Sequence, residues 1–160
     1  MPTAAENKAI VGQFLANGVS SDASIAMVTD DFRWVGPRSM EFLFEGGHAL
    51  EGGESLRGLP YLDHALYTSY EAGDENNSNV HFMIAEGDMV VMEFDAKFTG
   101  WEGEAYHNYY CLVFLLRDGK IAEVREHADT KYVWDTLLAT PEKRDAVQER
   151  LRRLRAGEAL

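Results

Sequence analysis

The chain changes its hydrophobic period near its middle, and this change limits the folds open to it more than any other feature. Before residue 71 apolar residues recur at helical spacing, whereas later they alternate as in strands. Four strands are expected in succession, at 80–85, 89–98, 105–116 and 121–128. Short glycine-containing turns are expected at 86–88 and 117–120. Helices followed by an antiparallel meander predict an α+β domain with helices on one face of the sheet.

Three helices are expected in the first half of the chain: Thr3 to about Gly18, Asp22 to Val28, and 61–70. The first begins with a capping box, in which Thr3 and Glu6 satisfy free amides at the helix start. Residues 29–31 are expected to break the second helix before a short strand over 32–35. The glycine-rich residues 38–58 predict a long loop or a ragged hairpin.

After the strands, helical spacing returns from Thr130, and Pro141 begins a last helix that mixes basic and acidic residues. Val147, Leu151 and Leu154 share one face of this helix. The pattern is typical of an amphipathic helix that docks either on its own chain or on a partner.

Composition and charge restrict the partners and the compartment. The formal net charge of −12 argues against nucleic acid, whose phosphates need clustered lysine and arginine. No apolar run is long enough for a membrane span, and the first residues lack a signal-peptide pattern, so we expect a cytoplasmic protein. One cysteine and scattered histidines indicate no metal site, and no phosphate-binding loop indicates a nucleotide, so no cofactor is expected.

Short segments stand in a particular order along this pattern: 29–34 (TDDFRW), 85–88 (AEGD), 106–110 (YHNYY), 114–121 (FLLRDGKI) and 125–130 (REHADT). Together they resemble the SnoaL-type polyketide cyclases and their ketosteroid-isomerase-like relatives, over about residues 5–138. The resemblance implies the cone-shaped nuclear-transport-factor-2-like fold, with three N-terminal helices packed on a curved, mostly antiparallel sheet and a C-terminal helical extension. We therefore assign 1–140 to a SnoaL-like domain and 141–160 to an amphipathic helix and tail.

The last strand carries the main catalytic candidate. Val124, Glu126 and Ala128 form its more apolar alternate set, which is the better candidate for a cavity face. A carboxylate among apolar walls holds its proton more tightly, which suits acid–base chemistry near neutral pH. The resemblance implies the same residue, because the acid after arginine in this motif is catalytic in limonene-epoxide-hydrolase-like proteins. The alternative is a surface Glu126 paired with Arg125, while Asp129 is expected to cap the next helix.

Polar groups on the preceding strand are expected to face the same cavity. Tyr106, Asn108 and Tyr110 alternate there, so their donors can polarise a carbonyl or hold an enolate oxygen beside Glu126. Plain packing of the aromatic rings is the alternative. Further substrate-binding candidates are Trp34, which takes the place of a pocket residue in the relatives, Ala128 and Val133.

Two further catalytic candidates rest on the resemblance. Asp95 corresponds to an acid that faces the cavity in the epoxide hydrolases, although Glu93 replaces their arginine two residues earlier. Hydrophobicity alone favours the opposite set of this strand inside. His81 matches the position of a catalytic histidine in dehydratase and dehydrochlorinase relatives, with a structural histidine as the alternative.

An inward Asp95 would leave four apolar residues on the outer face of the sheet: Val90, Met92, Phe94 and Phe98. Large exposed apolar patches are rare on monomers, so this arrangement predicts a homodimer through the sheet. Val147, Leu151 and Leu154 of the last helix are candidates for reinforcing the dimer.

The function that the resemblance implies is cofactor-independent acid–base catalysis of the cyclase, isomerase or dehydratase type. Its substrate would be a small hydrophobic or aromatic metabolite with a carbonyl or polyketide-like group. The alternatives are a non-catalytic ligand-binding protein of the same fold and an epoxide-hydrolase-like hydrolase. Polar side chains that converge beside Glu126 would favour an enzyme, whereas a wholly apolar pocket would favour binding alone.

Overall fold

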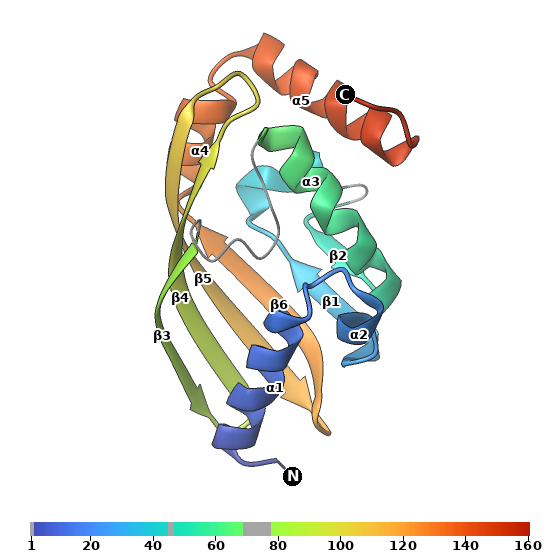
Figure 1. Ribbon diagram of the computed structural model, residues 1–160, viewed down its shortest axis with the longest axis vertical. Coiled ribbons are helices and arrows are strands. Elements are labelled where there is room, and N and C mark those ends of the chain that lie inside the picture. Colours follow the sequence, from blue (N-terminus) through green and yellow to red (C-terminus); the bar gives the residue numbers. More distant parts are fainter. Residues whose placement is uncertain (1, 45–46, 69–77) are drawn as a thin grey trace.

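Six strands form one curved sheet within residues 2–44, 47–68 and 78–160, which this computed structural model describes (Figure 1). The strands are β1 (Val28–Val35), β2 (Ala49–Glu51), β3 (Ser78–Glu86), β4 (Met89–Thr99), β5 (Ala105–Arg117) and β6 (Lys120–Ala128). The helices are α1 (Ala4–Ala16), α2 (Asp22–Ile25), α3 (Leu59–Leu66), α4 (Thr130–Leu137) and α5 (Pro141–Arg155), with 3-10 helices η1 (Arg38–Leu43) and η2 (Gly53–Gly58). The predicted α+β class is confirmed.

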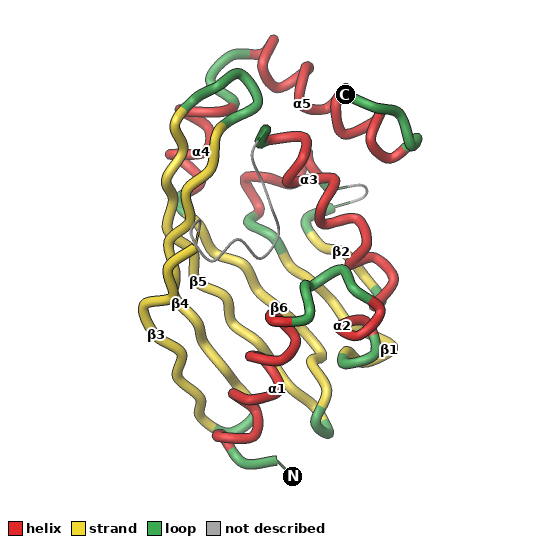
Figure 2. The backbone as a smooth tube through the Cα atoms, in the orientation of Figure 1, coloured by secondary structure: helices red, strands yellow, loops and turns green. Residues whose placement is uncertain are grey.

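The strands lie in the order β2-β1-β6-β5-β4-β3, and β1 and β6 form a parallel pair in an otherwise antiparallel sheet. Figure 2 shows α1 and α3 over the same face of the sheet, with α5 beyond α3. The four strands from β3 to β6 follow the predicted ranges closely. At the β5–β6 turn, Asp118 and Gly119 have φ angles of 52° and 75°, the left-handed pair that a two-residue hairpin turn requires.

The first half of the chain differs from the prediction in three places. The second helix ends at Ile25, because Val28 is buried and pairs with Ile121 as the first residue of β1, so 29–31 belong to a strand. The third helix covers Leu59–Leu66, and residues 69 and 70 of its predicted range lie outside the described residues. The 38–58 region contains two 3-10 helices and β2, which pairs with β1.

The central strand β4 turns its apolar set toward the helices. Val90 and Met92 are buried there, whereas Asp95 lies on the outer face of the sheet. Hydrophobicity therefore predicted the orientation of β4 correctly, and the resemblance to epoxide hydrolases predicted it wrongly. The apolar set lines the interior, so the argument that derived a dimer from its exposure fails, and homodimerisation itself stays a prediction.

Helix α5 docks on its own chain, the first of the two arrangements that the sequence left open. Val147 and Leu151 are buried, and α5 packs against α3 and η1. Arg150 fixes the contact by donating from Nε to the carbonyl of Ala65 at 2.9 Å, at the end of α3. None of the described helices is long and apolar enough to cross a membrane.

Because Leu151 is 2% exposed at this contact, Leu151→Ala should lower the free energy of unfolding by about 2–4 kcal/mol. The neighbouring Arg152→Ala removes an exposed ion pair with Glu149 and should cost less than about 1 kcal/mol. Urea unfolding measures both changes. Equal stability of the Leu151→Ala variant and the wild type would show that α5 is not docked in solution.

Candidate functional site

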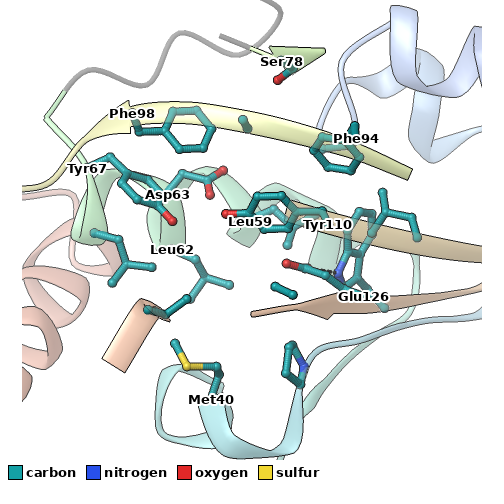
Figure 3. A pocket seen from close by; sticks show the side chains of 18 of the residues that line it. Met40, Leu59, Leu62, Asp63, Tyr67, Ser78, Phe94, Phe98, Tyr110 and Glu126 are labelled. Atoms are coloured by element: carbon teal, nitrogen blue, oxygen red, sulfur yellow. Dashed lines mark hydrogen bonds between the residues drawn. The ribbon is translucent and has the colours of Figure 1, made fainter. Parts of the chain in front are cut away.

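A cavity of about 540 Å³ lies between the sheet and the helices α1, η1 and α3. This volume is within the range of small-molecule sites in proteins. Figure 3 shows its walls, which are mostly apolar and include side chains from Met40, Leu62, Phe94 and Phe98. Predicted catalytic and substrate-binding residues that line it are Trp34, Tyr106, Tyr110, Glu126, Ala128 and Val133.

Glu126 is the acid that the sequence placed on the cavity face of β6. The parallel register pairs Trp34 with Val124, and the Trp34 indole reaches over to donate from Nε1 to Glu126 Oε2 at 3.0 Å. The Glu126 side chain is half-buried, and its exposed part faces the cavity rather than the outer surface of the protein. Burial raises the pKa of the Glu126 carboxyl, and the Trp34 hydrogen bond and the charge of His127 oppose this rise in part.

Three side chains of β5, from Asn108, Tyr106 and Tyr110, form a hydrogen-bonded chain beside this acid. Asn108 Nδ2 donates to the Tyr106 hydroxyl at 2.7 Å, and the Tyr106 and Tyr110 hydroxyls lie 3.2 Å apart. Burial raises the pKa of Tyr106 and of Tyr110, so both phenols keep their protons at neutral pH and remain donors. The negative charge of Glu126 also raises both pKa values, which places the acid within electrostatic reach of the phenols.

Asn108 does not line the cavity, contrary to its prediction as a substrate-binding residue. It is 1% exposed behind Tyr106, where Nδ2 also donates to the Asp129 carbonyl at 3.2 Å and Oδ1 accepts from the Tyr109 amide at 2.8 Å. These bonds fix the orientation of its amide. Asp129 caps α4 by accepting from the Tyr132 amide, as expected.

Asp63 and Tyr67, at the end of α3, also line the cavity and were missed in the sequence. Figure 3 shows their polar groups directed toward the space that Tyr110 and Glu126 also face. Asp63 shares a helical face with Leu59, Leu62 and Leu66, and an acid within such an apolar pattern was the available signal. Burial raises the pKa of the Tyr67 phenol well above its ordinary value.

Asp95 and His81 lie together on the opposite face of the sheet, so their predicted place at the cavity is wrong. The Asp95 carboxylate contacts His81 Nε2 at 2.6 Å and His107 Nε2 at 2.7 Å. A register irregularity between Val80 and Phe82 falls at His81. Hydrogen bonds from His107 and His81 lower the pKa of Asp95 to about 2, whereas those to Glu93 and Asp95 raise the pKa of His81.

Trp34→Phe should raise the pKa of Glu126 further, because the indole N–H favours the ionised carboxylate and phenylalanine offers no donor. Carbon NMR of protein with labelled glutamate measures this pKa directly. Trp134→Phe is the matched control, since Trp134 donates to the Ser39 carbonyl. A pKa of Glu126 that stays equal or falls in Trp34→Phe would contradict the hydrogen bond.

Asp95→Asn should lower the free energy of unfolding most between about pH 4 and about pH 6.5, where Asp95 is ionised and His81 is protonated. The raised pKa of His81 stabilises the folded state fully below about pH 6.5, the ordinary pKa of histidine. This stabilisation disappears as pH rises through the pKa of His81 in the folded protein. By about pH 9 the difference from the wild type should therefore shrink. Urea unfolding across pH tests this, and a difference independent of pH would refute it.

Comparison with known proteins adds to this geometry. The family model of the SnoaL-like domain matches residues 15–124. No curated protein matches the sequence.

Many solved structures share the fold, including the following three. One is a protein of Jannaschia sp. CCS1 assigned as a SnoaL-like polyketide cyclase, with 19% identity, 88% of this chain and 97% of that chain covered, and a TM-score of 0.65. A nuclear-transport-factor-2-like protein of Burkholderia thailandensis has 17% identity, coverage of 88% and 100%, and a TM-score of 0.65. TerC, crystallised with polyporic acid, has 20% identity, coverage of 84% and 99%, and a TM-score of 0.63.

The architecture of this chain is thus the nuclear-transport-factor-2-like fold that the resemblance implied. The family match spans more than half of the chain, and the protein belongs to the SnoaL-like domain family.

Proposed function

We propose that this protein is a general acid–base enzyme that needs no cofactor and acts on a small, mostly apolar carbonyl compound. The reaction is of the cyclase, isomerase or dehydratase type. One observation carries the proposal: Glu126, with its pKa raised by burial, faces an apolar cavity that also contains phenolic donors. Such a carboxyl group can both accept and return a proton near neutral pH.

The roles of the residues follow from their chemistry. Glu126 takes a proton from a carbon next to the substrate carbonyl and returns it at another atom. The hydroxyls of Tyr106 and Tyr110 donate to the oxygen on which negative charge develops. Asn108 donates to the Tyr106 oxygen, which leaves the Tyr106 proton to point toward Tyr110 or the ligand. Apolar walls exclude water and strengthen each of these interactions.

Two further observations support an enzyme over a ligand-binding protein. Several polar side chains converge on the cavity beside Glu126, an arrangement that favours catalysis over binding alone. The SnoaL-like family includes cyclases and isomerases, and the structural relative TerC was crystallised with polyporic acid. The epoxide-hydrolase alternative needs Asp95 in the cavity, and Asp95 lies on the outer face.

The probe 5-nitrobenzisoxazole tests the base without knowledge of the natural substrate. A base removes its ring C–H proton while the N–O bond breaks, and the phenolate product is coloured. The wild type should accelerate this elimination, because a carboxylate in an apolar site is a stronger base than one in water. Glu126→Gln removes the base and should lower the rate by about 10²–10⁴-fold.

Controls separate catalysis from folding. Tyr106→Phe removes one donor among several and should lower the rate by about 10-fold, while Glu86→Gln, exposed at the end of β3, should not change it. Glu126→Gln should keep or gain stability at neutral pH, because the enclosed carboxylate opposes folding. An unchanged elimination rate in folded Glu126→Gln protein would refute the proposal.

A further inference from the structure

The C-terminal end of α3 needs hydrogen-bond donors from outside the helix. The last four carbonyls of an α-helix have no partner within it. At this end the Tyr67 amide donates to the Asp63 carbonyl at 2.8 Å, and the Trp101 amide, from the β4–β5 connection, donates to the Leu66 carbonyl at 3.0 Å. The two carbonyls between these need donors from another element.

Arg150 of α5 supplies both donors from a distant position in the chain. Its Nε donates to the Ala65 carbonyl at 2.9 Å and its Nη2 to the His64 carbonyl at 3.0 Å. The guanidinium also lies over the Trp101 ring, 5.3 Å from its centre. A cation is favourable at a helix C-terminus, and a planar guanidinium can bind two neighbouring carbonyls at once. Arg150 therefore joins α5, the end of α3 and the β4–β5 connection.

The Tyr67 side chain extends from this end of α3 into the cavity, toward the phenols of β5 (Figure 3). Its ring lies 5.2 Å from that of Tyr106 and 4.6 Å from that of Phe98, measured between centres. Burial, and then the neighbouring phenols of Tyr110 and Tyr106, raise the pKa of Tyr67 well above its ordinary value. The three hydroxyls therefore lie within reach of one another, and Tyr67 keeps its proton at neutral pH.

A count of protons shows what a third phenol adds. Each phenol has one proton to donate. The Tyr106 and Tyr110 hydroxyls lie 3.2 Å apart, and while one donates to the other, this pair has a single proton left for a ligand. An oxygen on which negative charge develops accepts two hydrogen bonds or more. Tyr67 can supply the second.

We propose that Tyr67 is a further catalytic proton donor of this site and that Arg150 is the residue that positions it. Tyr67 donates, together with the phenols of β5, to the ligand oxygen on which negative charge develops. Arg150 holds the last turn of α3 and thereby fixes the place of the Tyr67 hydroxyl. The inference rests on the proposed function for the reaction in which Tyr67 donates. It gives a role to α5, which lies outside the residues 15–124 that the family model matches.

The donor is tested first by the elimination rate with 5-nitrobenzisoxazole, in which the phenolate oxygen gains negative charge. Tyr67→Phe should lower this rate by about 10-fold, as the loss of one donor among several. Tyr61→Phe removes an exposed hydroxyl from the start of the same helix and should leave the rate unchanged. A wild-type rate in folded Tyr67→Phe protein would overturn the proposal.

The positioning role is tested by a double-mutant cycle. Arg150→Met should lower the elimination rate by about 3-fold to about 10-fold, because a displaced donor contributes less. In the Tyr67→Phe background the same substitution should change the rate by less than about 2-fold, since the group that Arg150 positions is absent. A purely structural role for Arg150 would give equal losses in both backgrounds, and this result would overturn the proposal.

Arg144→Met is the matched control for Arg150→Met. Arg144 is also on α5, lies 5.3 Å from the centre of the Trp134 ring and donates to the Leu138 carbonyl, but at the end of α4. Its loss should leave the rate within about 2-fold of the wild type. Circular dichroism checks folding. If Arg150→Met does not fold, Arg150→Lys replaces it in the cycle, because lysine keeps the charge without the planar pair of donors.

Carbon NMR of protein labelled at tyrosine Cζ tests the positioning without catalysis. Arg150→Met should shift the Tyr67 signal, which is assigned by its loss in Tyr67→Phe, and Arg144→Met should not. An unchanged Tyr67 signal in Arg150→Met would overturn the positioning role.

The outcomes of the two proposals are separable. An elimination rate that depends on Glu126 but not on Tyr67 would refute only the further donor. A rate that does not depend on Glu126 would refute the acid–base function, and the Tyr67 signal would still decide the role of Arg150.

Discussion

The site depends on one hydrogen bond, from the Trp34 indole to the Glu126 carboxylate, between the only parallel pair of strands in the described sheet. Burial raises the pKa of Glu126, and this bond limits the rise, so the group stays able to exchange its proton. A basic partner would lower the pKa of this carboxyl, and loss of the indole donor would raise it further. The neutral indole gives the intermediate state that acid–base work needs.

The rest of the fold maintains an unfilled space in front of this acid. The concave sheet face needs cover, yet α1, η1 and α3 approach it without closing the gap. The backbone of Tyr67 bridges to Gly100, which ties the end of α3 to the β4–β5 connection, and α5 packs over α3 from outside. The helix that carries Asp63 is thus held at its C-terminal end and covered on its outer side. Rigid walls of this kind let a few polar groups keep fixed positions around a ligand.

The strands from β3 to β6 were predictable because hydrophobic alternation and hairpin turns are local signals. The start of α1 was predictable because its capping box is also local. Glu126 was predictable too, as the acid in an otherwise apolar alternate set of its strand. The prediction that Asp95 faces the cavity is wrong because it rests on the resemblance and contradicts the hydrophobic pattern of β4. The burial of Val90 and Met92 agrees with that pattern. The sequence did not predict Asp63 at the cavity, because a short helix tolerates an acid at the edge of its apolar face. No local signal could show that it meets Glu126 across a cavity.

The central claim is that Glu126 acts as a base whose pKa is set by its enclosure. The most direct measurement is the pH dependence of the wild-type elimination rate with 5-nitrobenzisoxazole. The account predicts a rate that rises with pH and reaches a plateau above the ordinary pKa of glutamate, at the pKa that carbon NMR gives for Glu126. A rate that rises in proportion to hydroxide, or a plateau at the ordinary glutamate value, would contradict it.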